Sequence, residues 1–240
     1  MSIRTDNFGG SMRGRSHIFF GNVAKHYDDW YSTPPSKYAE RIEDHFLLET
    51  LEGLSGSILE VGCGTGNYLK KLSGFVEKVG LDYSMDMLEI SAKKANCPLV
   101  NGRAESLPFK DGSFDIVFAM TAIEFFDDIE KGLHEMVRVS RKHIILGFLS
   151  KPSLMHFARK VANAFTRNEF SFYNPQNSRK LMRFLSKRYD NLRLVYRRTT
   201  LLFYPIYFKR LEKVFEFFDL KFSMVNLGGF SVLHFKKEWE

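Results

Sequence analysis

Residues 57–72 read SILEVGCGTGNYLKKL, and this stretch decides the fold. Its apolar start, interrupted only by the carboxylate of Glu60, predicts a buried strand over Ser57–Val61. A helix-like segment, Asn67–Leu72, closes the stretch. Glycines occupy every second position between this strand and this helix. Such a cluster is expected where the backbone turns tightly or lies against another group. The glycines between the strand and the helix are Gly62, Gly64 and Gly66.

A strand, a glycine loop and a helix in this order build a binding site for a polar or anionic molecule. Glycines let a ligand approach the backbone, and the free N–H groups of the first helical turn point at it. Asp82 ends the next expected strand, where a carboxylate can accept both ribose hydroxyls of a nucleoside. In a doubly wound sheet such residues lie beyond the C-terminal ends of the strands. The sequence therefore indicates a site for an adenosine-containing cofactor.

The glycine spacing separates the possible cofactors. The dinucleotide fingerprint is G-x-G-x-x-G, whereas here the third glycine, Gly66, comes one residue early. The sequence also contains no G-x-x-x-x-G-K-[ST] phosphate loop. A nicotinamide-dependent dehydrogenase is therefore disfavoured.

Strand-like and helix-like segments alternate along the chain, which favours a parallel sheet with helices on both faces. Two helices are expected before the glycine loop, at Gly21–Tyr31 and Lys37–Leu51, separated by the breaker STPPS. The later expected strands are Glu77–Leu81, Pro98–Asn101, Ser113–Met120, Lys142–Leu149, the segment LRLVYRR and Phe230–Phe235. The later expected helices are Ser84–Lys94, Ile129–Val139, Pro152–Phe165, Gln176–Lys187 and Tyr207–Phe218.

Length and composition indicate the organisation of the protein and its compartment. The chain has 240 residues, of which 44% are hydrophobic, so we expect a flexible tail over residues 1–20 and a single domain over residues 21–240. No apolar run approaches the length of a membrane span, and the N-terminus lacks the apolar core of a signal peptide. The two cysteines, Cys63 and Cys97, have no metal-ligand spacing. A reduced, cytoplasmic protein without a metal is therefore expected.

Charge is unevenly distributed along the chain. Residues 1–150 carry 17 Lys/Arg and 21 Asp/Glu, whereas residues 151–240 carry 18 and 7. This asymmetry suggests an anionic partner such as a head group, a membrane surface or RNA phosphates. The alternative is a solvated basic face around an aromatic core. The basic residues concerned include Arg159, Lys160, Arg167, Arg179 and Lys180.

Three segments resemble successive motifs of class I S-adenosylmethionine-dependent methyltransferases, namely LEVGCGTGNYLKKL, VGLDYSMDMLEISAKK and NGRAESLPFKDGSFDIVFAMTAIEFFDD. The most similar branch is the small-molecule one that includes ubiquinone and menaquinone biosynthesis methyltransferases. The resemblance implies a Rossmann-like, doubly wound, seven-stranded and mostly parallel sheet whose last strand is antiparallel. Helical insertions over residues 151–174 and 203–220 would form a cover over the substrate.

By the same resemblance, S-adenosylmethionine is the expected cofactor and S-adenosylhomocysteine its product. The backbone around Gly62, Cys63 and Gly64 would hold the methionine part of the cofactor, with Glu60 ordering the loop. Two structural interpretations stand beside this one: Cys63 as a small buried filler, and Gly64 as a residue that only permits a turn.

The second and third motifs would surround the adenosine. Asp82 would bind the ribose and Tyr83 would lie against the adenine, while the Ala104 N–H and Glu105 would read the adenine edge. The alternatives are a helix N-cap for Asp82 and a surface charge for Glu105. The residues expected near the sulfonium, at the end of the fourth strand, are Met120 and Thr121.

Methyl transfer from a sulfonium is an in-line displacement with a neutral leaving group, so positioning can provide much of the rate. Glu124 is the candidate for a substrate contact or a base, with capping of a helix start as the alternative. Phe125 and Phe126 stand where many relatives have a histidine or another polar residue. Candidates for the aromatic wall, whose alternative is ordinary packing, are Tyr27, Trp30 and Tyr31. Candidates in the substrate cover are His156 and Tyr173.

Three hypotheses about function follow from these residues. The leading one is a methyltransferase for a small hydrophobic or aromatic acceptor, because the expected cover is rich in Phe and Tyr. The second is an RNA-modifying methyltransferase, although AMTAIEFF stands where an N-P-P-Y motif would follow the fourth strand. The third is a partner subunit that binds S-adenosylmethionine without catalysis.

Overall fold

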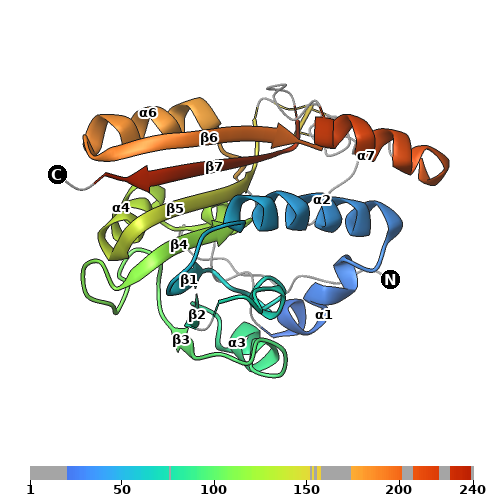
Figure 1. Ribbon diagram of the computed structural model, residues 1–240. Coiled ribbons are helices and arrows are strands. Elements are labelled where there is room, and N and C mark those ends of the chain that lie inside the picture. Colours follow the sequence, from blue (N-terminus) through green and yellow to red (C-terminus); the bar gives the residue numbers. More distant parts are fainter. Residues whose placement is uncertain are drawn as a thin grey trace, which may run out of the picture.

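The computed structural model describes residues 21–75, 77–151, 153, 156–157, 174–201, 208–221 and 228–238, with the side chain of Trp30 outside the description. Within these ranges seven strands form one sheet with helices on both faces (Figure 1). The strands are β1 (Ile58–Val61), β2 (Lys78–Asp82), β3 (Leu99–Asn101), β4 (Phe114–Met120), β5 (Ser140–Leu149), β6 (Leu192–Thr200) and β7 (Phe230–Lys237). The α-helices are α1 (Asn22–Trp30), α2 (Pro34–Leu51), α3 (Met85–Ser91), α4 (Ile129–Val139), α6 (Ser178–Arg188) and α7 (Glu212–Lys221). The short 3₁₀ turns are η2 (Leu69–Lys71), η3 (Ile123–Phe125) and η6 (Lys209–Leu211).

The strand order is β3-β2-β1-β4-β5-β7-β6. β1 to β5 pair in parallel, and β7 runs antiparallel between β5 and β6. The expected doubly wound, mostly parallel sheet with an antiparallel last strand is therefore confirmed. The order of the strands reverses between β1 and β4, and ligands of such sheets bind at this reversal, beyond the carboxyl ends of the strands.

The core lies on both faces of the central strands, and every residue of β4 is buried. On one face, α4 and α6 contribute residues such as Met136 and Leu185 to a continuous apolar cluster. On the other face, α2 and α7 contribute Tyr38, Phe46 and Phe215. Burial on both faces explains why the central strands read as nearly continuous apolar runs.

Local signals explain where the elements begin, and they correct two expected boundaries. α2 begins at Pro34 rather than Lys37, because the Thr33 side chain caps the helix and two prolines occupy its first turn. The expected helix over Asn67–Leu72 is only the turn η2, since Lys71 and Leu72 each donate to the carbonyl three residues back and Leu72 leaves the helical region.

Two further helices differ in extent from the sequence expectation. α3 ends at Ser91 instead of Lys94, and turns lead to Asn96, whose φ is +44°. α7 begins at Glu212 after η6 and continues to Lys221. The expected tail over residues 1–20, most of the expected helix over Pro152–Phe165 and most of the expected cover insertion over 151–174 lie outside the described residues. Of the second cover insertion, over 203–220, only residues 203–207 lie outside them.

The end of the sheet opposite the strand carboxyl ends is closed by paired polar groups. Asp115 on β4 accepts hydrogen bonds from the N–H (3.0 Å) and Oγ (3.2 Å) of Ser57. Its other carboxylate oxygen lies 3.1 Å from both Arg141 and Lys142. Burial opposes ionisation of Asp115, but the Ser57 hydrogen bonds and the two cations hold the pKa below its ordinary value.

None of the helices that the structure describes is long and apolar enough to cross a lipid bilayer.

Candidate functional site

A cavity of about 890 Å³, including its mouth, lies at the carboxyl ends of β1, β2 and β4. All ten residues expected to bind the cofactor line it, together with two of the three expected aromatic wall residues. Its position suits a nucleoside-containing ligand, because it lies at the reversal of the strand order and is lined by the glycine loop and Asp82. The predicted residues on its wall are Tyr27, Tyr31, Glu60, Gly62, Cys63, Gly64, Asp82, Tyr83, Ala104, Glu105, Met120 and Thr121.

The glycine loop takes a backbone conformation that side chains rarely allow. Gly62, Gly64 and Gly66 have φ values of +77°, +50° and +78°. A Cβ on Gly62 would lie 2.6 Å from the Cβ of Ala122, whereas one on Gly64 would meet nothing within 4 Å. Gly62 is therefore required for packing, and the backbone at Gly64 faces open space where a ligand can approach.

Asp82 organises this loop. Its two carboxylate oxygens accept one hydrogen bond each, from the N–H of Gly64 (2.8 Å) and from the N–H of Ser84 (2.8 Å). The N-cap of α3 is Ser84, whose Oγ accepts from the Met87 N–H, so the alternative role of Asp82 as the cap is wrong. Each carboxylate oxygen has a second lone pair. Asp82 can therefore hold the loop and accept ribose hydroxyls at the same time.

Glu60 is the least satisfied charged group of the cavity. It is 1% exposed, and neither of its carboxylate oxygens has a hydrogen-bond partner among the described residues. Burial, and secondly the nearby Asp82, raise the pKa of Glu60 well above its ordinary value. The expected ordering of the loop by Glu60 is not seen, since Gly62 and Cys63 donate to the Leu81 carbonyl instead.

An unpartnered buried carboxylate is costly unless a cation pairs with it. The methionine part of S-adenosylmethionine carries an ammonium group that fits this requirement of Glu60. The open backbone at Gly64 and the spare lone pairs of Asp82 fit the rest of the same molecule. The residues present therefore fit the expected cofactor.

The wall expected for the adenine contains an additional residue, Arg103. Its guanidinium lies 4.6 Å from the ring centroid of Tyr83 and pairs with Asp127. Glu105 accepts hydrogen bonds from the N–H groups of Asp127 (2.7 Å) and Asp128 (3.2 Å). Glu105 is therefore not a simple surface charge, because it fixes the segment that leads into α4.

The end of β4 carries local backbone strain at the cavity. Thr121 has a φ of +47°, an unusual value for a β-branched residue, and its N–H donates to the Gly147 carbonyl at 2.8 Å. Such a conformation costs on the order of 1–3 kcal/mol and persists only where the surroundings impose it. The bend turns the chain from the buried strand towards Phe125 and Phe126, which also line the cavity.

Helix α1 closes one side of the cavity and is held there by Asp28. One Asp28 oxygen accepts from Thr65 Oγ1 (2.8 Å) and Asn67 Nδ2 (3.0 Å), and the other pairs with Lys94. At the start of the helix, the Gly21 N–H donates to Asp86 at 2.6 Å. α1 is thus attached to the glycine loop, to α3 and to the segment after it.

Tyr27 of α1 and Tyr31, which directly follows the helix, line the cavity. The hydroxyl groups of Tyr27 and Tyr31 lie 3.4 Å apart, and burial raises the pKa of Tyr27 to about 12. Tyr27 is therefore a neutral phenol at physiological pH.

Two further candidates that the structure describes, Glu124 and His156, do not line the cavity. Glu124 is fully buried on η3, does not line the cavity and accepts a hydrogen bond from the Leu149 N–H. Burial raises the pKa of Glu124 to about 8. Glu124 therefore does not line the described cavity, and its substrate contact stays a prediction. His156 does not line the cavity, and Tyr173 lies outside the described residues.

Sequence reasoning missed a buried pair beside the cavity. Tyr68, which lines it, donates a hydrogen bond to Glu43 of α2 at 3.0 Å. Burial raises the pKa of Glu43 to about 8. The helical spacing of α2 places Glu43 among apolar residues, and this was the available signal.

The fold and the cavity together define the class of protein: a Rossmann-like α/β protein with a ligand-binding cavity at the reversal of its strand order. Comparison with known proteins narrows this class. A model of the methyltransferase domain matches residues 59–146. A demethylmenaquinone methyltransferase from Anoxybacillus flavithermus is 30% identical over 177 residues, which are 68% of this chain and 73% of that protein. The chain therefore belongs to the methyltransferase-domain family.

Other similarities show how far the match extends. An uncharacterised protein from Methanocaldococcus jannaschii is 36% identical over 50% of this chain and 45% of its own length. Two further curated relatives are covered over 63% and 51% of their lengths, so the chain spans only part of several relatives that it matches. A crystal structure of a SAM-dependent methyltransferase from Thermotoga maritima, described as a possible histamine N-methyltransferase, shares the fold. Its TM-score is 0.68 at 24% identity, over 92% of this chain and 99% of that one.

Proposed function

We propose that this protein transfers a methyl group from S-adenosylmethionine to a small acceptor of apolar or aromatic character. The observation that carries the proposal is the arrangement of Glu60, the glycine loop and Asp82 around one cavity. Each of these offers a different group for one part of the same molecule. Similarity to relatives named as demethylmenaquinone methyltransferases supports an aromatic acceptor.

The first half of the chain would hold the methyl donor. Glu60 would pair with its ammonium group, the backbone at Gly64 would lie beside its methionine part, and Asp82 would accept its ribose hydroxyls. Tyr83 and the Ala104 N–H would meet the adenine. When bound, the donor supplies a methyl group activated by a positively charged sulfur.

The opposite wall would receive the acceptor. The described residues on this side offer aromatic faces and phenol hydroxyls, from Tyr27, Tyr31, Phe125 and Phe126. They exclude water and restrict the orientation of a planar apolar molecule, and aromatic faces attract a cation by about 1 kcal/mol. With Glu124 turned away from the cavity, these residues act by position, which can supply effective molarities of about 10⁵–10⁸ M.

Calorimetric titration with S-adenosylmethionine, S-adenosylhomocysteine and NAD tests the donor site. We expect both adenosyl ligands to bind and NAD not to bind. Asp82→Ala should weaken adenosyl binding by about tenfold or more, because it removes the ribose acceptor and the support of the glycine loop. Glu130→Ala, an exposed change on α4, is the matched control. Adenosyl binding that is absent, or indifferent to Asp82, would contradict the proposal.

A further inference from the structure

Helix α7 directs its acidic side chains towards the protein. Glu212 accepts a hydrogen bond from Arg41 of α2 at 2.5 Å, and Glu216 lies 3.9 Å from the same guanidinium. Asp219 accepts a hydrogen bond from the buried hydroxyl of Tyr38. Phe215, between them on the same face, is 7% exposed. All three acids of the helix are therefore engaged on its inner side.

The outer side of α7 and η6 is apolar. Its large side chains are between 39% and 63% exposed, which is unusual for a cluster of this size on a protein surface. Val214 and Phe217 lie on the side of α7 away from the buried Phe215, whereas Leu211 and Phe218, four residues before and three after it, flank its buried side. These residues are Phe208, Leu211, Val214, Phe217 and Phe218.

Among the described residues of η6 and α7, the charged side chains that do not contact Arg41 or Tyr38 are all basic. Four basic residues lie on η6 and α7, and the Lys221 ammonium lies 5.1 Å from the ring centroid of Phe217. With the acids engaged inside, no negative side chain of α7 balances them on the outer side. Helices that lie in a membrane interface combine the same two features, an apolar face and flanking cations. The four basic residues are Lys209, Arg210, Lys213 and Lys221.

We propose that the outer face of α7 and η6 docks on an anionic lipid bilayer. The charge decides between possible occupants of the face, because a second copy would bring the same four cations against one another. Anionic lipid head groups instead attract such residues, each by roughly 1 kcal/mol. This inference goes beyond the proposed methyl transfer, since it concerns where the protein works.

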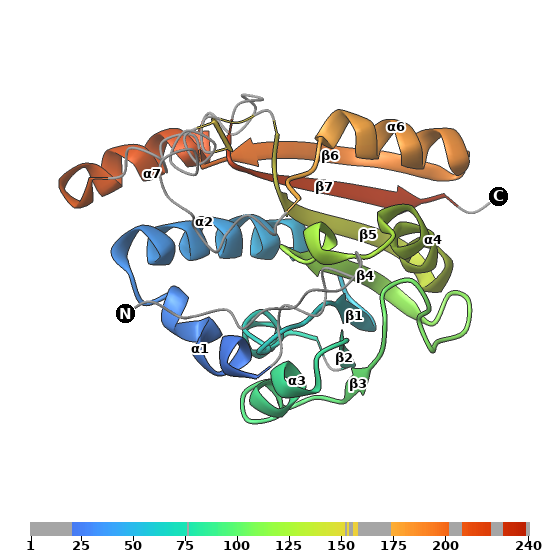
Figure 2. The same cartoon turned by 180° about the vertical axis from the view of Figure 1, so that it is seen from behind.

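The location of α7 links the docking surface to the cavity. The Thr200 hydroxyl at the end of β6 donates to the Asp219 carbonyl, and β6 ends at the same edge of the sheet as β1. α2 lies between α7 and α1, the wall of the cavity (Figure 2). Docking therefore places the ligand-binding edge of the sheet near the bilayer, within reach of an acceptor dissolved in it.

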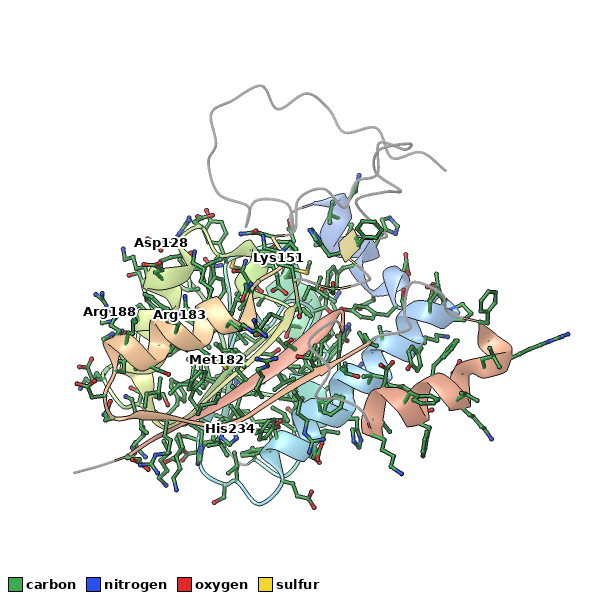
Figure 3. The ribbon with its side chains drawn as sticks, turned by 90° about the horizontal axis from the view of Figure 1, so that it is seen from above. Asp128, Lys151, Met182, Arg183, Arg188 and His234 are labelled. Atoms are coloured by element: carbon green, nitrogen blue, oxygen red, sulfur yellow. The ribbon has the colours of Figure 1, made fainter. Side chains whose placement is uncertain are left out.

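The proposed contact uses basic residues other than Arg179 and Lys180, although both sets lie within the basic part of the chain, residues 151–240. α6, which carries Arg179, Lys180 and Arg183, lies at the opposite end of the molecule from α7, whose side chains project outward (Figure 3). The basic residues of α6 therefore provide a matched control for those of α7.

Co-sedimentation of the full chain with vesicles tests the proposal, using phosphatidylcholine alone and phosphatidylcholine mixed with phosphatidylglycerol. We expect binding to the mixed vesicles and weaker binding to phosphatidylcholine. The apolar pair variant Val214→Gln with Phe217→Gln should bind at least about tenfold more weakly, as should the charge variant Arg210→Glu with Lys213→Glu. The controls, Val195→Gln on exposed β6 and Arg183→Glu with Lys187→Glu on α6, should bind as the wild type does.

Three results would overturn the proposal. The first is a wild type that binds neither vesicle. The second is equal weakening by the α6 and α7 charge variants, which would show non-specific attraction. The third is a dimer that the apolar pair variant separates while vesicle binding is unchanged, which would assign the face to a second copy. Because S-adenosylmethionine binding by the same variants is measured separately, failure of the docking leaves the test of the donor site intact.

Discussion

Glu60 and Asp115 are buried carboxylic acids on neighbouring strands, and they lie at opposite ends of the sheet in opposite electrostatic settings. Asp115 receives hydrogen bonds from Ser57 and lies beside Arg141 and Lys142. Glu60 receives no hydrogen bond from the described residues and has Asp82, another acid, as its charged neighbour.

This difference in partners indicates that Asp115 has a structural role and that Glu60 has a role in binding. Hydrogen bonds and neighbouring cations of the protein itself compensate the negative charge of Asp115, so its ionised form stabilises the fold. No group among the described residues compensates a negative charge on Glu60, so its ionised form is costly unless a cation binds beside it. Burial alone does not reveal which role a carboxylate has; its hydrogen-bond partners do.

The largest effect of a single substitution is expected for the free energy of unfolding when Asp115 is replaced. Asp115→Ala leaves the buried N–H and hydroxyl of Ser57 without their acceptor, which should lower the free energy of unfolding by about 3 kcal/mol, whereas Arg141 and Lys142 are half exposed and stay solvated. Chemical denaturation measures this change, with the exposed Asp190→Ala as the control. S-adenosylmethionine affinity should stay within about twofold of the wild type. An Asp115→Ala protein as stable as the wild type would contradict the structural role of Asp115.

A smaller effect, on ligand affinity rather than on stability, is expected when Glu60 is replaced. Glu60→Gln keeps the shape of the side chain and removes its charge, so it should weaken S-adenosylmethionine binding by about thirtyfold, or about 2 kcal/mol. The free energy of unfolding without ligand should not fall, because the cost of burying the charge disappears. Calorimetry and denaturation of the same variant measure the two quantities. A destabilised variant with normal affinity would assign Glu60 to the structural class.

A third effect, seen as a dependence on pH rather than at a single pH, concerns Glu124, whose pKa of about 8 in the folded protein exceeds its ordinary value. The folded state then holds a proton that the unfolded state releases, so stability falls as pH rises from about 4.5 to 8. Glu124→Gln should remove a slope of about 1 kcal/mol per pH unit from this window. The nearby Glu43 contributes with the same sign.

Denaturation at a series of pH values measures this slope as the difference between variant and wild type. Taking the difference cancels the opposite contribution of His234, whose pKa burial lowers to about 4. Glu130→Gln on the surface of α4 is the control. Parallel curves for wild type and Glu124→Gln would show that this side chain stays charged in the folded protein.

The sequence predicted those parts of the molecule that depend on local pattern. Alternating segments gave the strands, and residues at strand ends met at one edge because parallel strands end together. The position of Glu124 could not be predicted in this way, because it lies on η3, which turns its side chain away from the end of β4. The role of Asp28 was not predictable, since it depends on a partner far along the chain. Helical spacing could signal the burial of Glu43, but not its pairing with Tyr68. The outward apolar face of α7 likewise appears only once α2 has covered the other side.

The attachment of α1 through Asp28 has a consequence for the rate at which bound molecules exchange. A molecule that leaves past α1 has to wait until Thr65, Asn67 and Lys94 release the same carboxylate. Residence time on this route then depends on the opening of the helix as well as on affinity, as in enzymes whose slow step is release of product. Because the pair of Asp28 with Lys94 is partly exposed, added salt shortens that residence time.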